Sequence, residues 1–148
     1  MIHLYHESSG ELKGRQAIYE YIHGGRGIVT LVSPSGQQHT YQFSRPSERD
    51  SFPEDVIFIY AIHDGIKRFY IGMVEQDKFR LTAHSRFLPD TEIVKGANYI
   101  MRMASEPNLS TPMKLYHEGM CCFCGRQLTS DKSISTGIGP KCRRRLDG

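Results

Sequence analysis

The sequence lacks the long apolar runs of a membrane protein. The longest run, residues 56–62, has seven residues, whereas a membrane-spanning helix needs roughly 20. The first ten residues, MIHLYHESSG, also lack the apolar stretch of a signal peptide. We therefore expect a soluble protein that is cytoplasmic, neither inserted in a membrane nor secreted.

Cysteine is absent from the first 120 residues. All four cysteines, Cys121, Cys122, Cys124 and Cys142, fall in the last 28 residues, so disulfides cannot tie the larger part of the chain together. This distribution favours a reducing compartment and a local role for the thiols. The length of 148 residues suits one domain with a small appendage, and 39% hydrophobic residues suffice for a packed core.

The central part of the sequence contains short β-type runs separated by turn residues. Apolar, aromatic and β-branched residues predict five strands, at residues 27–33, 37–43, 56–62, 67–74 and 78–83. Helical spacing of apolar residues predicts a short helix over 11–23 and a second helix after Asp90 that covers the sheet. The predicted fold class is therefore α+β, an antiparallel sheet of about five strands with two helices.

The cysteines at the end of the chain have the spacing of metal ligands. They form the pattern H-x3-C-x2-C-x17-C over His117, Cys121, Cys124 and Cys142, and Zn²⁺ in structural sites takes four nitrogen or sulfur ligands of this kind. His117 is the best candidate for the fourth ligand, and Cys122 is the runner-up. The alternative is that the cysteines are reduced and pack as small hydrophobic side chains. The zinc hypothesis predicts that replacing His117 or Cys142 releases the ion.

The proposed zinc site and the segment before it predict a second unit of the chain. Pro107 and Pro112 enclose Asn, Ser and Thr, a composition typical of a linker. We therefore predict an α+β domain over residues 1–106, a linker over 107–112 and a small zinc knuckle module over 113–148. A module of this size buries little apolar surface, so metal coordination would supply much of its folding free energy.

Signatures of catalysis are missing from the sequence. It contains neither H-E-x-x-H nor the paired motifs of zinc deaminases, and four protein ligands would leave zinc no open position for water. The spacing of His39, His63 and His84 does not suggest a catalytic group either. We expect a protein that is not an enzyme.

The C-terminal segment resembles a known family. The residues that carry the resemblance are H-E-G-M-C from His117, C-G-R-Q-L-T from Cys124, Ser133-Ile134 and G-I-G-P-K-C ending at Cys142. They are similar to a zinc-finger-like family of unknown function that is common in bacteriophage and mobile-element proteins. The resemblance implies a bound zinc and a phage or prophage origin, and it implies no particular biochemical activity.

The charge of the chain is uneven. Residues 1–112 carry a net charge of −1, whereas residues 113–148 carry +4. The cations that would face a nucleic acid are Arg126, Lys141, Arg143, Arg144 and Arg145, and such side chains give sequence-independent affinity for phosphates. The arginine run could equally be a solvated chain end. We expect a noncatalytic phage-type accessory protein that binds nucleic acid, or alternatively a protein-binding module that inhibits or redirects a host factor.

Aromatic residues on the predicted strands offer a second candidate surface. They are Tyr41, Phe43, Phe69, Tyr70 and Phe79. With Arg68 and Arg80 beside them they could stack on the bases of a single strand. Because a sheet and a helix must bury large side chains, we expect most of these aromatics to lie in the core.

Overall fold

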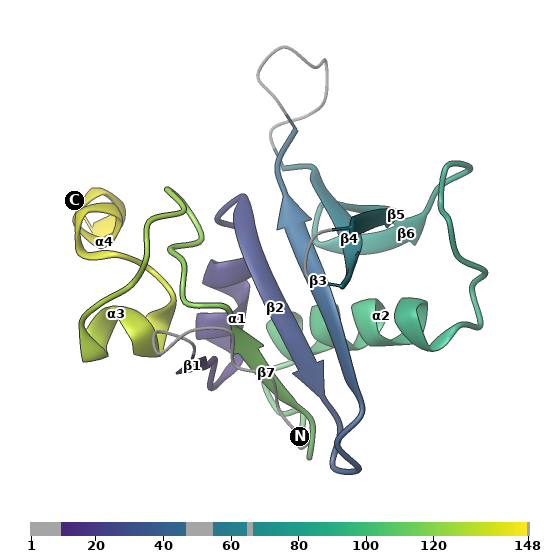
Figure 1. The fold of residues 1–148 in the computed structure, drawn as a ribbon, viewed down its shortest axis with the longest axis horizontal. Coiled ribbons are helices and arrows are strands. Elements are labelled where there is room, and N and C mark those ends of the chain that lie inside the picture. Colours follow the sequence, from purple (N-terminus) through teal and green to yellow (C-terminus); the bar gives the residue numbers. More distant parts are fainter. Residues whose placement is uncertain (1–9, 47–54, 65–66, 148) are drawn as a thin grey trace.

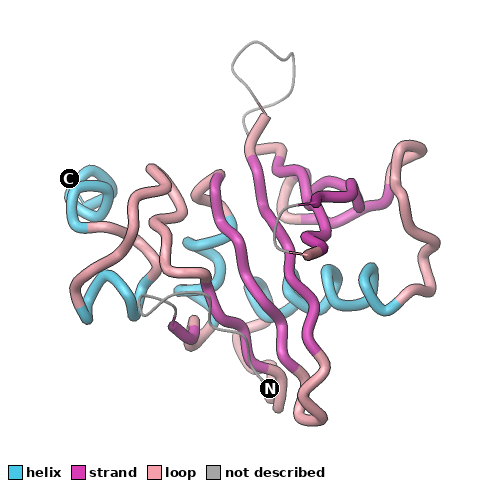
Figure 2. The backbone as a smooth tube through the Cα atoms, in the orientation of Figure 1, coloured by secondary structure: helices cyan, strands magenta, loops and turns pink. Residues whose placement is uncertain are grey.

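One seven-stranded antiparallel sheet organises the protein. The computed structural model describes residues 10–46, 55–64 and 67–147. The strands are β1 (Gly10–Glu11), β2 (Arg26–Val32), β3 (Gln38–Ser44), β4 (Ile57–His63), β5 (Lys67–Glu75), β6 (Lys78–Leu81) and β7 (Lys114–His117). They lie in the order β1-β7-β2-β3-β4-β5-β6 (Figures 1 and 2). The C-terminal segment thus contributes a strand between the two N-terminal strands β1 and β2.

The structure also contains four helices. They are α1 (Arg15–Ile22), α2 (Glu92–Ser105), α3 (Asp131–Thr136) and α4 (Pro140–Asp147). Among the described residues, no helix is long and apolar enough to cross a membrane.

The α+β class, the antiparallel sheet and the five predicted strands, β2 to β6, are confirmed, as are the first two helices. The predicted number of elements was too low, because the residues that the structure describes already form seven strands and four helices. The additional strands, β1 and β7, have two and four residues. Neither is long enough to show a clear alternation of apolar and polar residues in the sequence. The division of the chain at residues 107–112 stays a prediction, although β7 lies after that segment and pairs with β2.

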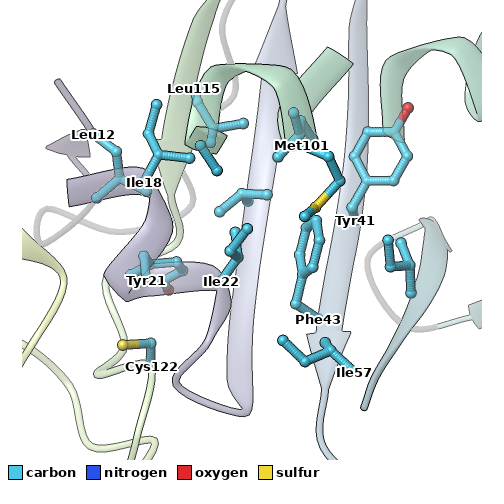
Figure 3. Close-up of a cluster of buried hydrophobic side chains, with 14 of the residues drawn as sticks. Leu12, Ile18, Tyr21, Ile22, Tyr41, Phe43, Ile57, Met101, Leu115 and Cys122 are labelled. Carbon is cyan, nitrogen blue, oxygen red and sulfur yellow. The ribbon is translucent and has the colours of Figure 1, made fainter. Parts of the chain in front are cut away.

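The helices α1 and α2 cover one face of the sheet and enclose the core with it. Val29, Tyr41, Phe43 and Ile59 point toward these helices and are fully buried, as the close-up in Figure 3 shows for Tyr41 and Phe43. Tyr41 donates a hydrogen bond of 2.7 Å to the carbonyl oxygen of Ile93 in α2. Tyr41 and Phe43 are therefore core residues and not a stacking platform.

The opposite side of the sheet, which we call the open face, has no helix among the described residues on it. The register pairs Gln42 with Tyr60 and Tyr60 with Tyr70, so these three side chains share this face. All three are partly exposed. Part of the predicted aromatic set, Tyr70, thus lies on the open face, and Phe79 packs against the core instead.

Tyr21 joins the C-terminal segment to the rest of the molecule. Its ring is 1% exposed and stacks on His117 of β7 with 5.6 Å between centroids. Its hydroxyl donates a 3.2 Å hydrogen bond to the carbonyl oxygen of Met120. Gly137, with φ at 76°, leaves room for this ring, because a Cβ there would lie 2.3 Å from the ring edge of Tyr21. The turn that contains Cys121 and Cys124, which we call the knuckle, and helix α3 are therefore packed against α1.

We predict that Gly137→Ala destabilises the protein far more than Gly36→Ala. Both glycines have positive φ, at 76° and 89°, but no atom lies within 4 Å of a Cβ built at Gly36. Gly36→Ala should cost only the left-handed backbone penalty of about 1–2 kcal/mol. Gly137→Ala should cost about 1–3 kcal/mol more, since Tyr21 must move. Urea unfolding of the two variants measures the difference in the free energy of unfolding. Equal losses would show that the Tyr21 ring can move aside without cost.

Candidate metal centre

A tight turn brings Cys121 and Cys124 together. The amide of Leu128 donates to the carbonyl of Gly119 at 2.8 Å, and the amide of Cys121 donates to the carbonyl of Arg126 at 2.8 Å. Inside this hairpin the amide of Gly125 donates to the carbonyl of Cys121 at 2.9 Å, with Gly125 at φ 78°. A glycine is needed at this position because the chain turns in the left-handed region.

Cys142 reaches the same place from the first turn of α4. A capping box between Ser130 and Ser133 starts α3, and Gly137 ends it in the left-handed conformation. Pro140, whose fixed φ suits a first helical position, then begins α4. As a result the sulfur atoms of Cys121, Cys124 and Cys142 all lie within 4.8 Å of one another.

The surroundings of the three thiols differ. Burial acts to raise the pKa of Cys121, but the amides of Gly139, Cys124 and Phe123 outweigh it, so this pKa lies below its ordinary value. The Gly139 amide is 3.3 Å from the sulfur. Burial, together with the hydrogen bonds that its own S–H donates to Cys121 and Cys124, raises the pKa of Cys142 to about 11. Cys121 therefore becomes a thiolate, the form that binds metal, more readily than Cys142.

The donor set fits a zinc ion. Zinc–sulfur bonds of about 2.3 Å at tetrahedral angles place two sulfurs about 3.8 Å apart, so a separation within 4.8 Å requires only a small contraction. Two of the thiols are buried and Cys124 is exposed, so the cluster opens to solvent on one side. The three cysteines could thus hold a metal ion, and no fourth protein ligand joins them among the residues that the structure describes.

His117, the predicted fourth ligand, lies apart from the thiols. It is 1% exposed, its Nδ1 accepts a 3.0 Å hydrogen bond from the amide of Gly119, and its Nε2 lies 2.5 Å from the carbonyl oxygen of Ile134. Burial holds the pKa of His117 below its usual value, which favours the neutral form of the ring. In this arrangement neither ring nitrogen has a lone pair free for a metal. His117 as a ligand stays a prediction that requires the ring to leave both partners.

Cys122, the runner-up, also points away from the three thiols. Its side chain is fully buried beside Tyr21 (Figure 3), and its sulfur lies 3.9 Å from the carbonyl oxygen of Glu20. Burial, followed by the nearby Cys121, holds the pKa of Cys122 well above its usual range. A Cβ at Gly24 would lie 2.6 Å from this sulfur. Cys122 therefore packs as a small core residue under α1.

Three of the five predicted nucleic-acid contacts surround the metal cluster. A hollow of about 350 Å³ is lined by the three thiols and by Arg126, Lys141 and Arg145. Arg144 instead lines a neighbouring hollow with Lys132. Arg143 forms a partly buried ion pair with Glu20 of α1, with 3.2 Å between nitrogen and oxygen. Arg143, Arg144 and Arg145 are consecutive in the sequence, but in the structure each side chain has different neighbours.

Comparison with known proteins locates one similarity, in this region. Residues 115–147 match a family of unknown function, DUF6011. The match contains the three clustered cysteines and begins inside β7. It supports the sequence-based resemblance to a family of unknown function, and it names neither a phage nor a zinc-finger family. No curated protein and no solved structure matches the chain.

Sequence reasoning missed two features of this site. The amide of Gly139 supports the Cys121 sulfur, and the G-I-G-P motif contains this residue without indicating such a contact. The second feature is the role of Tyr21, which lies about a hundred positions before the knuckle. A single sequence carries no signal for such a long-range contact.

We predict that Cys142→Ser releases the metal and Cys122→Ser keeps it. Each variant replaces one buried thiol by a hydroxyl, so the pair controls for the loss of a sulfur. Only Cys142 belongs to the cluster, and a hydroxyl is a much poorer zinc ligand than a thiolate. Intact-mass measurement under native conditions gives the metal stoichiometry. Metal loss from Cys122→Ser with retention by Cys142→Ser would assign the site to Cys122.

We predict that His117→Ala lowers the free energy of unfolding by about 2–4 kcal/mol and keeps one equivalent of metal. The variant leaves a buried amide and a buried carbonyl without their partner and opens a cavity. His39→Ala is a matched control, because the buried Nε2 of His39 has no hydrogen-bond partner in the described part of the chain. Loss of metal from a folded His117→Ala protein would instead establish His117 as the fourth ligand.

Proposed function

We propose that this protein is a noncatalytic, zinc-binding accessory protein that binds nucleic acid through its C-terminal module. The observation that carries the proposal is the shared hollow, in which three thiols and the cations Arg126, Lys141 and Arg145 line the same surface. In this proposal zinc fixes the knuckle and the start of α4. The cations are then held at a defined distance from one another.

The charges in this hollow favour an anionic partner. A zinc ion with three thiolates carries a net charge of −1, and three cations around it leave an excess of about two positive charges. All three cations are exposed, so they remain accessible to phosphate oxygens. Phosphate contacts of this kind give affinity without base preference.

Of the other two predicted contacts, Arg144 is exposed and remains in the proposed surface as a flanking residue. Arg143 has a structural partner, Glu20, and in the proposal its main task is to hold α4 on α1. It would contribute to the positive potential without leaving that ion pair. In the proposal the arginine run therefore has two roles: some of its side chains face the nucleic acid, and Arg143 holds α4 against α1.

The setting of this function follows from the sequence resemblance. A phage-type accessory protein would act in the cytoplasm of the host cell, on phage or host nucleic acid. The alternative is a module that binds and redirects a host protein. The near-neutral charge of residues 1–112 suits that alternative, which gains support if nucleic-acid binding is absent at low salt.

We predict that the triple variant Arg126→Gln, Lys141→Gln, Arg145→Gln weakens binding to a short DNA duplex and to a single strand alike, without releasing zinc. Each lost phosphate contact should reduce the slope of log affinity against log salt by about 0.7–0.9. Titrations at several salt concentrations measure both quantities.

The matched control removes the same charge elsewhere. Arg15, Lys95 and Arg102 are exposed on α1 and α2, and their replacement by Gln should leave the salt slope nearly unchanged. Equal effects of the two triple variants would attribute the binding to net charge alone and contradict the proposed site.

A further inference from the structure

A second hollow lies on the open face, far along the sheet from the metal cluster. It measures about 310 Å³ and is lined by Phe58, Tyr60, Tyr70, Met73, Thr82 and His84. We call it the ring pocket. Four of the six lining residues belong to β4 and β5, and these strands lie on the side of the sheet away from α3 and α4 (Figure 1). Its volume is at the small end of the range for ligand sites.

The aromatic rings of the pocket hold one another in place. Tyr70 meets Phe58 edge-to-face at 6.0 Å between centroids and Tyr60 at 5.8 Å. The hydroxyl of Thr82 donates a 3.2 Å hydrogen bond to the Tyr70 oxygen. In each pair the edge of one ring meets the face of the other, and Arg68 lies over the Tyr60 ring. Tyr60 and Tyr70 are still partly exposed, and it is this exposed ring surface that a planar ligand can contact.

Cations and amides flank the ring pocket on the same face. The guanidinium of Arg68 lies 4.3 Å from the centre of the Tyr60 ring and donates a 3.0 Å hydrogen bond to Gln42. The register also places Lys78 and Arg80 on this face, opposite Glu75 and Met73. Only Glu75 among the side chains of β4–β6 on this face is acidic, and it pairs with Arg80 at 3.5 Å. The surface therefore suits an anionic ligand with flat apolar parts.

We propose that the ring pocket binds nucleobases of single-stranded nucleic acid by stacking, with Arg68 and Arg80 contacting the neighbouring phosphates. This inference rests on the proposed function and specifies its ligand as a single strand. In a duplex the base faces are covered by their neighbours, whereas a single strand can offer them to Tyr60 and Tyr70. An apolar peptide would use the rings but would bring no anionic group to Arg68 and Arg80.

The ring pocket and the metal module are separate surfaces. Two strands, β2 and β3, lie between β7, which belongs to the C-terminal module, and β4, and neighbouring strands are about 4.8 Å apart. Substitutions in one surface should therefore leave the other intact. Stacking and phosphate contacts also respond differently to salt, because only the latter release counterions.

The test compares two oligonucleotides on the full-length protein. One is an eight-nucleotide oligo(dT), and the other is an abasic strand with the same number of phosphates. The chain has no tryptophan and eight tyrosines, so stacking on Tyr60 and Tyr70 should quench tyrosine emission. We expect oligo(dT) to bind at least tenfold more tightly than the abasic strand and to quench this emission.

A pair of variants assigns the effect to the ring pocket. The double variant Tyr60→Leu, Tyr70→Leu keeps large apolar side chains without the rings, and it should weaken oligo(dT) binding about 10- to 100-fold with an unchanged salt slope. Tyr60→Phe with Tyr70→Phe should restore the affinity. Tyr116→Leu is the matched control, since Tyr116 is partly exposed on the same face but on β7.

Two results would overturn the inference, and they are distinguishable from failure of the proposed function. Equal binding of the oligo(dT) and abasic strands shows that bases do not stack, while dependence on Arg126, Lys141 and Arg145 would still support the metal module as the binding surface. An unchanged affinity for oligo(dT) in the folded Tyr60→Leu, Tyr70→Leu variant would likewise show that bases do not stack in the ring pocket. Absence of binding to either strand at low salt contradicts both proposals.

Discussion

The packing of Tyr21 determines where the C-terminal segment lies. Its ring fills the space left by two glycines from distant parts of the chain, since a Cβ would come within 2.7 Å of it at Gly27 and 2.3 Å at Gly137. His117 covers the ring, and the hydroxyl holds the backbone at Met120. Burial keeps the pKa of Tyr21 far above its usual value, which favours the protonated hydroxyl that donates to Met120. One side chain thus connects α1, β2, β7, the knuckle and the end of α3.

This packing couples the cluster of three cysteines, the candidate metal site, to the rest of the fold. Directly after Met120, the thiols of Cys121 and Cys122 point to different sides, one to the metal cluster and one to the core beneath α1. The amide of Arg26 donates a 2.9 Å hydrogen bond to the carbonyl oxygen of Cys122, and this bond connects the knuckle to β2. Metal binding to small zinc modules contributes about 10–16 kcal/mol in isolated peptides. Because the knuckle is packed on α1 and β2, part of that free energy would stabilise their contacts as well.

The sequence allowed strands β2 to β6 and helix α2 to be predicted because each has a clear periodicity or is bounded by turn residues. It did not show which aromatics are buried. In residues 56–62 every side chain is apolar, so alternation cannot distinguish the core face from the open face, and Phe58 and Tyr60 were missed as surface residues. The cysteine spacing correctly brought Cys121, Cys124 and Cys142 together. Spacing alone could not place His117, whose neighbours Ile134 and Tyr21 are set by long-range packing.

The arrangement of the two candidate surfaces has a physical consequence for binding. Phosphate contacts at the metal module would be long-range and weakened by salt, whereas stacking in the ring pocket would act at contact distance and be nearly independent of salt. A rigid sheet holds the two surfaces at a fixed separation, because β7, β2, β3 and β4 are joined by continuous ladders of hydrogen bonds. A strand long enough to span this distance would bind both surfaces, and the second contact would form at high effective concentration. The affinity for single strands should then rise sharply once their length exceeds that separation, while the affinity for duplexes rises only gradually with length.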